Sequence, residues 1–452
     1  MAEVAVDLVV VDGIVVTSTE MYAGGVAIDN GVIVAVGQMD GLPEGRQVLS
    51  AGGNYILPGL IDPHVHFRDP GLTHKEDYTT GSLAALMGGV TTVLDMPNVL
   101  PPTSTAERVR ERRHLIESKS YIDVMLVGVI VQDNLDEIKA MAEAGVVGYK
   151  VFLGSTVGGI PAPDDGTLLD AMAAVAETGR RVGFHAENDA IVQHRVQQLR
   201  ARGHTDPLAH LESRPAIAEA EAIQRIVLFA KQTGAEAHIF HLSSRQGLEV
   251  VAGSRASGST ITAETGPRYL FLDARELVDL GSVLKMNPPI RTHAHGQALY
   301  QGLLEGAIDF IASDHAPHTE EEKMKGSIWE AMAGFVGVET MMQVMLSEAV
   351  NKRGMSLQQF VRVCAENAAR AWGVYPRKGT LHVGADADIT IVDLDAPWII
   401  DRGRLHSRSR VTPWHGYSGV GKPITTIIRG QVLLREGVFV GRRPQGIPVW
   451  LV

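Results

Sequence analysis

The chain has 452 residues, of which 45% are hydrophobic and 21% are charged, a composition typical of a folded globular protein. Its formal net charge of −11 argues against a broad nucleic-acid-binding surface. The single cysteine, Cys364, rules out an intramolecular disulfide and fits a reducing compartment, so we expect a cytoplasmic protein. The first ten residues contain acids and no long apolar run, which predicts neither a signal peptide nor a membrane span.

From residue 7 to residue 38 the sequence consists of short β-branched runs separated by turn residues. The runs "DLVVVDGIVV", "GGVAIDNG" and "VIVAVGQ" predict successive strands joined by tight Asp-Gly and Asn-Gly connections. We therefore assign residues 1–57 to a small β-sheet domain.

Between residues 58 and 377 the pattern changes to strands alternating with helices. Apolar runs such as "TTVLDM" and "DVMLVGVI" alternate with helical stretches such as "IAEAEAIQRIVLFAKQTG". This rhythm predicts a parallel α/β sheet, which periodicity alone leaves as either a closed barrel or an open doubly wound sheet. Histidine, lysine and aspartate recur at the carboxyl ends of the runs, where a (β/α)8 barrel carries its active site. We therefore predict a (β/α)8 barrel over residues 58–377.

The segment 378–452 again contains short β-branched runs like those of the N-terminal segment. The runs "ADITIVDL", "ITTIIRGQVLL" and "GVFVG" again predict short strands. We predict that residues 1–57 and 378–452 together form one small β-sandwich beside the barrel. Two unrelated β appendages are the alternative.

Four histidines and one aspartate lie at the ends of predicted strands. His64 and His66, in "GLIDPHVHFRDPG", are two positions apart, so both imidazoles point to the same face of a strand and can meet one metal ion. His185 ends "RVGFH", His241 ends "AHIFH" and Asp314 ends "IDFIASD". Any one of these residues is equally well explained as a structural residue, and a lone His-X-His pair is weak evidence. Together they predict a site for divalent transition metals such as zinc.

Lys150, in "VGYKVFLG", follows the apolar start of another predicted strand. A surface lysine there would be unremarkable in function, but a desolvated lysine can lose its proton. A neutral amine reacts with carbon dioxide, and the resulting carbamate has two oxygens that can bridge two cations. Our hypothesis is a binuclear site bridged by carbamylated Lys150.

These motifs, in this order over nearly the whole chain, resemble the cyclic amidohydrolase family: dihydroorotases, allantoinases, hydantoinases and dihydropyrimidinases. The resemblance implies a (β/α)8 barrel with a β-sandwich, a small cyclic amide as substrate, and a homo-oligomer, either a dimer or a tetramer. It also implies two divalent metal ions, one bound by His64, His66 and Asp314 and one by His185 and His241, with Lys150 bridging. Some relatives have lost ligands and serve as scaffolds, but all six positions are filled here, which argues against that alternative.

The expected mechanism needs no organic cofactor. Two cations lower the pKa of a bridging water, so that hydroxide forms at neutral pH and attacks the ring amide carbon. One metal polarises the carbonyl oxygen and stabilises the developing negative charge. Asp314 acts as the catalytic acid and base by passing the proton to the leaving ring nitrogen.

Four residues beside the metal motifs bear on the identity of the ring. Arg68, Asn98 and His318 could together hold a carboxylate, the arginine by a two-pronged contact. In dihydroorotases the matching positions hold the substrate's carboxylate, and Asn287 in "LKMNPPIR" also resembles that group. Each residue also has a structural explanation, such as an ion pair, a turn cap or a solvated loop. Our main prediction is a dihydroorotase, which interconverts dihydroorotate and N-carbamoyl-L-aspartate.

The alternative is an allantoinase or a hydantoinase-like enzyme that opens a neutral cyclic ureide or imide. Parts of the chain, notably "AETGPRYL" and "NPPIR", resemble allantoinases, and Arg268 and Tyr269 stand where dihydroorotases commonly show histidines. Hydantoinases usually have a tyrosine five residues after the bridging lysine, where this chain has Ser155. The charged segment 317–328, "PHTEEEKMKGSI", is either a solvated loop or a segment that helps to close the barrel mouth.

Overall fold

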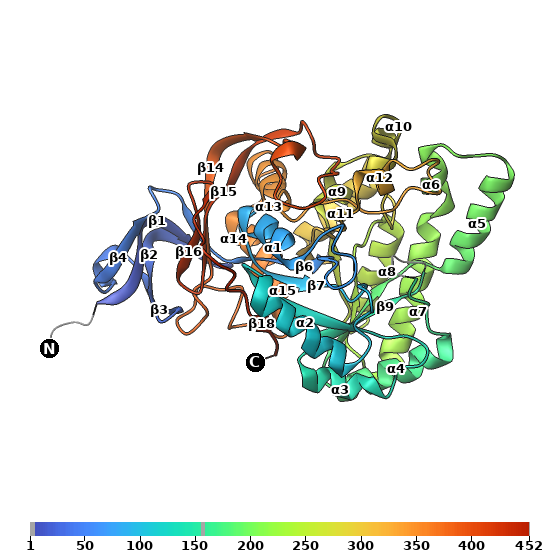
Figure 1. Cartoon of the computed structure of the whole chain (residues 1–452), viewed down its shortest axis with the longest axis horizontal. Coiled ribbons are helices and arrows are strands. Elements are labelled where there is room, and N and C mark those ends of the chain that lie inside the picture. The colour runs from blue at the N-terminus through green and yellow to red at the C-terminus, as the bar shows by residue number, and fades with distance from the viewer. Residues whose placement is uncertain (1–4, 155–158, 452) are drawn as a thin grey trace.

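The computed structural model describes residues 5–154 and 159–451, which form two β-sheets lying side by side (Figure 1). One sheet is a barrel surrounded by helices, on the right of the view. The other is built from strands of both chain ends, blue and dark red, on the left. No helix of the described chain has the length and apolar character needed to cross a membrane.

Eight parallel strands form the barrel in their order along the chain, from β6 to β13. A backbone bridge between Val65 in β6 and His315 just after β13 joins the last strand to the first. Every residue of β6, β7 and β8 is buried, as expected for parallel strands covered on both faces. The predicted barrel is therefore confirmed. Its strands are β6 (Leu60–Val65), β7 (Val90–Asp95), β8 (Asp123–Val129), β9 (Gly148–Phe152), β10 (Arg181–His185), β11 (Ala237–Ile239), β12 (Thr262–Thr265) and β13 (Phe310–Ile311).

The helices that surround the barrel begin and end at residues that commonly cap helices. The Asp77 side chain accepts from Thr80 N at the start of α1, and Gly234, in the left-handed region with φ 76°, ends α7. The α-helices are α1 (Tyr78–Met87), α2 (Ala106–Lys119), α3 (Glu137–Ala144), α4 (Asp165–Glu177), α5 (Asp189–Ala201), α6 (Pro207–Ser213), α7 (Ala216–Thr233), α8 (Arg245–Ala256), α9 (Pro267–Phe271), α10 (Leu277–Leu280), α11 (His293–Leu304), α12 (Glu320–Lys323), α13 (Met341–Met345), α14 (Leu357–Val361) and α15 (Asn367–Ala371). Short 3-10 segments lie at Met39–Gly41, Ala274–Glu276, Gly281–Leu284 and Arg402–Arg404, and π-helical segments at Leu346–Asn351 and Arg362–Glu366.

The second sheet joins the two ends of the chain, as predicted. Its strand order is β17-β16-β15-β14-β5-β1-β2-β3, with β4 also paired to β1. The ends meet where β5 pairs antiparallel with β14, with Ile56 opposite Ile391. The strands are β1 (Val6–Val16), β2 (Met21–Asp29), β3 (Val32–Gly37), β4 (Gly45–Ser50), β5 (Tyr55–Pro58), β14 (Ile389–Ile399), β15 (Ser418–Ile428), β16 (Gln431–Arg435) and β17 (Val438–Phe439).

Two parts of the segment predicted to belong wholly to the small sheet domain, 378–452, contact the barrel instead. Strand β18 (Pro448–Val449) pairs in parallel with Val124 and Met125 of β8. The connection between β14 and β15 reaches the loops that follow β6 and β13. Both contacts join residues more than 90 positions apart, so strand periodicity could not reveal them.

A buried ion network joins the barrel to the second sheet. Lys378 Nζ lies 2.5 Å from Asp123 Oδ2 on β8 and 2.6 Å from Asp388 Oδ2 just before β14. Arg429 also pairs with Asp123. Lys378, Asp123 and Asp388 are all nearly inaccessible to solvent, so these charges depend on each other.

Replacing Lys378 by methionine should destabilise the protein by about 3–5 kcal/mol, because the buried carboxylates of Asp123 and Asp388 lose their main counter-charge. Chemical denaturation monitored by circular dichroism measures this loss. Lys352→Met removes a lysine that is about half exposed and should change stability little. Equal stability of the two variants would show that the network contributes little to joining the two sheets.

Candidate metal centre

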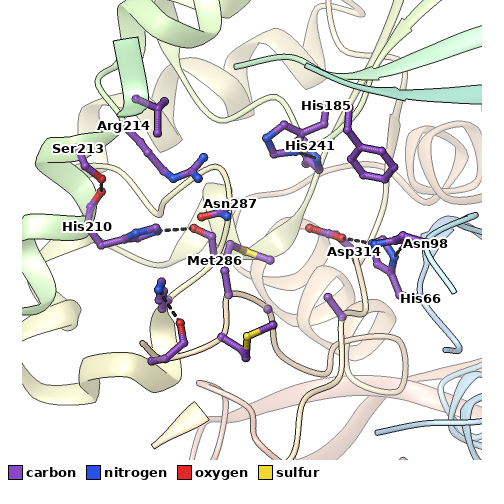
Figure 2. Close-up of a pocket in the computed structure, with 18 of the residues that line it drawn as sticks. His66, Asn98, His185, His210, Ser213, Arg214, His241, Met286, Asn287 and Asp314 are labelled. Carbon is purple, nitrogen blue, oxygen red and sulfur yellow. Dashed lines mark hydrogen bonds and ion pairs between the residues drawn. The ribbon is translucent and has the colours of Figure 1, made fainter. Parts of the chain in front are cut away.

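The structure brings all six predicted metal ligands to the carboxyl-terminal rim of the barrel, where they line one cavity. His66 Nε2 and His64 Nε2 lie 3.1 Å and 3.4 Å from the same oxygen of Asp314. His185 Nδ1 lies 3.0 Å from His241 Nε2, and the rings of His64 and His241 are 5.3 Å apart. Figure 2 shows His185, His241, His66 and Asp314 on one side of the cavity.

The histidines are oriented as metal ligands usually are. His64 Nδ1 donates to Glu264 Oε1 at 2.6 Å, His66 Nδ1 to Asn98 Oδ1 at 2.7 Å, and His185 Nε2 to Glu187 Oε2 at 2.8 Å. Each of these bonds leaves the other ring nitrogen with a lone pair for a cation. Burial is the main reason why the pKa of His64 lies well below its ordinary value, so its imidazole is neutral.

Three buried nitrogens of the cluster have no hydrogen-bond partner among the residues that the structure describes: His64 Nε2, Lys150 Nζ and His241 Nδ1. Unpaired buried polar atoms are costly in free energy, so such a set calls for a ligand. Nitrogen and carboxylate donors of this kind suit divalent transition metals. The residues present therefore fit a metal centre.

Lys150 lines the cavity and lies against two aromatic rings, those of Phe152 and Phe240. Its Nζ lies 3.6 Å from the centre of the Phe240 ring, and its side chain is completely buried. This burial lowers the pKa of Lys150 to about 7, against the opposing charges of Asp314 and Glu264. A substantial fraction of the amine is therefore neutral near pH 7.

Asp314 is held from behind by Arg268, whose role the sequence left open. Arg268 Nη1 donates to Ser313 O at 2.6 Å, and its Nη2 lies 3.3 Å from Asp314 Oδ2. Burial alone would raise the pKa of Asp314, but the contact with the His66 imidazole and the charge of Arg268 keep it below the ordinary value. Among the described residues Arg268 is not part of the cavity lining, and its contacts hold the Asp314 carboxylate in position. Tyr269 Oη donates to Pro288 O at 2.8 Å and supports the loop that carries Asn287.

Three residues of the cavity have a strained backbone. Arg68, His241 and Asp314 have φ values of 62°, 42° and 45°, in the left-handed region that non-glycine residues rarely adopt. Each directly follows a barrel strand or lies within three residues of one. Such strain is typical of functional sites, where the surrounding fold holds a side chain in a required direction.

Sequence reasoning missed two buried carboxylates that orient the histidines. Glu264, in β12, lies between His64 and His238. Glu187 accepts from His185 and also pairs with Arg214. The one available signal was that both glutamates lie at or just after the ends of predicted strands, in "TAE" and "HAE", a pattern that by itself names no partner.

The cavity has a volume of about 330 Å³, at the lower end of the range common for small-molecule sites. Arg68, Asn98 and Asn287, which the sequence predicts to bind substrate, line it. Arg68 Nε and Nη1 and Asn287 Oδ1 are buried and unpaired within the described chain. Figure 2 shows Asn287 and Met286 between the metal-ligating side and a facing wall that carries His210, Ser213 and Arg214.

His318, also predicted to bind substrate, does not line this cavity. Its Nε2 donates to Ala333 O at 3.1 Å, and its Nδ1 accepts from Lys75 Nζ at 3.2 Å. Both ring nitrogens are therefore occupied, and we do not retain His318 as a substrate ligand. Its role is to hold the backbone at Ala333, which does line the cavity.

The charged segment 317–328 is folded onto the barrel mouth. Its Lys323 is buried, and Nζ donates to Lys285 O at 2.9 Å. Lys285 Nζ in turn donates to Ile328 O and Ala331 O, both at 2.5 Å. The next residues, 329–334, line the cavity. Ser155, which separates this chain from the hydantoinase pattern, lies outside the described residues.

Comparison with known proteins agrees with this geometry. The model of the "Amidohydrolase family" matches residues 55–433. The chain is 34% identical over 435 residues to an L-hydantoinase of Paenarthrobacter aurescens, covering 95% of each, and 36% identical to an allantoinase of Enterococcus faecalis, covering 98% of each. The solved structure of an L-hydantoinase (dihydropyrimidinase) from Arthrobacter aurescens superposes with a TM-score of 0.96 at 33% identity, over 98% of this chain and 100% of that one. The chain therefore belongs to the amidohydrolase family, among the members that hydrolyse cyclic amides.

Proposed function

We propose that this enzyme opens a five-membered cyclic ureide of the hydantoin type, with allantoin and 5-substituted hydantoins as the first substrates to test. The names of the relatives, allantoinase and L-hydantoinase, support this alternative better than our main prediction of a dihydroorotase. The observation that carries the proposal is the cluster of six ligand residues with three buried unpaired nitrogens beside a cavity of about 330 Å³.

We assign two divalent cations, with zinc as the expected metal, to the cluster. His64, His66 and Asp314 offer atoms within 4.8 Å of one another for one ion, and His185 and His241 serve the other. Carbamylated Lys150 would offer two further oxygen ligands to these ions; its pKa of about 7 and its buried amine, unpaired within the described chain, support this role. Bound cations of this kind acidify water and polarise a carbonyl oxygen.

The residues of the chain then bind the ring and move the proton. Asp314 takes the proton of the attacking water and gives it to the ring nitrogen that leaves. Asn287 Oδ1, unpaired among the described residues, accepts a ring N–H. Arg214, on the facing wall, uses only Nη1 in the hydrogen bonds found in the described chain. Its remaining donors suit a polar substituent such as the ureido group of allantoin.

One observation favours a second candidate, dihydroorotate. The Arg68 guanidinium is almost completely buried, yet its Nε and Nη1 find no partner in the described parts of the chain. Burial lowers the pKa of Arg68 to about 10, so the group still carries its charge at neutral pH. A buried arginine with unpaired N–H groups is a suitable receptor for a substrate carboxylate.

The test is a side-by-side assay of the zinc-loaded enzyme with allantoin, hydantoin, dihydrouracil and dihydroorotate, using wild type and Arg68→Met. We expect a hydantoin-type ring to give the highest kcat/KM and the variant to lose about tenfold on it, the cost of one hydrogen bond from a charged group. Dominant activity on dihydroorotate, with a loss of about a thousandfold in the variant, would instead establish the second candidate. Arg200→Met, at the mouth of the same cavity, controls for the loss of one positive charge.

A further inference from the structure

A second cavity, of about 340 Å³, lies outside the metal centre and close to the barrel mouth. It is enclosed by part of the connection between β14 and β15, residues 402–411, and by residues of the loops after β6 and β13. Its charged lining consists of three arginines, one histidine and one glutamate: Arg402, Arg408, Arg410, His74 and Glu320. This lining is basic, although the whole chain carries a net charge of −11.

The positive charge of this cavity is only partly neutralised. Residues 402–410 contain four arginines and no acid. Arg408 pairs with Asp77, but Arg410 donates its Nη1 to Gly403 O, a neutral acceptor, at 2.8 Å. Arg402 Nη1 lies 3.1 Å from Glu320 Oε1, with both side chains about half exposed or more, and such surface pairs contribute little and open easily.

The same segment, residues 402–411, is hydrogen-bonded to both ends of residues 318–336, part of which lines the catalytic cavity. Ser409 Oγ donates to His318 O at one end, and Val336 N donates to Val411 O at 3.1 Å at the other. Between these points, His318 Nε2 holds Ala333 O at 3.1 Å, and residues 329–334 line the catalytic cavity. Residues 402–411 are therefore connected through hydrogen bonds to the residues that form one wall of the active site.

We propose that this second cavity binds a small multivalent oxyanion of the phosphate class and that its occupation alters ring opening through residues 318–336. Arginine side chains offer paired N–H donors that match phosphate oxygens. Among the described residues Val411 is the only hydrophobic one in the lining, so the cavity suits a compact, fully polar anion and not one with an aromatic base. The site is distinct from the metal centre and does not depend on the identity of the ring.

Binding is tested by isothermal titration calorimetry of the metal-loaded enzyme with inorganic phosphate and pyrophosphate at constant ionic strength. We expect saturable binding that weakens by at least about tenfold in R402A/R410A. R404A is the matched control, because Arg404 belongs to the same segment but does not line the cavity. Lack of saturable binding to wild type, an equal loss in R404A, or unchanged binding in the double variant, as expected for phosphate on the metals, would each overturn the proposal. Citrate binding as tightly as pyrophosphate would overturn the assignment to the phosphate class.

The coupling is tested separately by steady-state kinetics with the best ring substrate. Saturating pyrophosphate should change kcat/KM by about fivefold or more in wild type and R404A but not in R402A/R410A. Binding without this change would overturn the coupling and leave the anion site. If no ring were opened, the calorimetric result would still stand, so failure of the proposed function is distinguishable from failure of this inference.

Discussion

Replacing Asp314 by asparagine is expected to lower kcat for ring opening by about a thousandfold while the barrel stays folded. The substitution keeps the size of the side chain but removes the negative charge that faces His66, at 3.1 Å, and Arg268, at 3.3 Å. Asparagine cannot take and return a proton, and loss of a positioned proton-transfer group costs about 10²–10⁴-fold in rate. It is also a weaker metal ligand than a carboxylate, so the metal content should fall.

The measurements are kcat with the best ring substrate and metal content by mass spectrometry of the dialysed protein. Asp165→Asn makes the same change at an exposed site at the start of α4 and should leave both quantities unchanged. Wild-type kcat in Asp314→Asn would remove this residue from the proton-transfer step. Circular dichroism checks that both variants are folded.

The second large effect is expected for Lys150→Ala. If Lys150 carries the carbamate that bridges two cations, its loss removes two oxygen ligands, and activity should fall by about a thousandfold or more together with the metal content. The substitution also leaves space beside Phe240, whose ring centre lies 3.6 Å from the Lys150 Nζ. A short carboxylic acid such as propionate should enter that space and restore part of the activity.

Native mass spectrometry of wild type in bicarbonate provides an independent readout, because the carbamate adds the mass of carbon dioxide. Lys139→Ala, on the outer helix α3, is the control and should retain metals, activity and the added mass. Full metal binding in Lys150→Ala, or the absence of added mass in active wild type, would contradict a bridging carbamate. Loss of activity without rescue by any short acid would weaken it.

The chain order of the fold and most of the site follow from local sequence patterns. Buried runs that alternate with helices predict parallel strands, and the carboxyl ends of parallel strands meet on one rim of a barrel. For this reason His64, Lys150, His241 and Asp314, far apart in the sequence, could be expected to lie together. The two chain ends were likewise predicted to share a sheet, because both contain short β-branched runs that are typical of strands.

The contacts that each site residue makes were decided by residues distant in the sequence. A local sequence pattern carries no information about such contacts. Asn98 was expected to face substrate; it lines the cavity, and its side-chain oxygen, 2.7 Å from His66 Nδ1, also orients that ring. His318 was expected in the pocket, but Lys75 and Ala333 hold it outside. The sequence left the role of Arg268 open, and the structure places its guanidinium beside the Asp314 carboxylate. Local patterns determine which residues end strands, whereas the packing of distant segments determines what each side chain then faces.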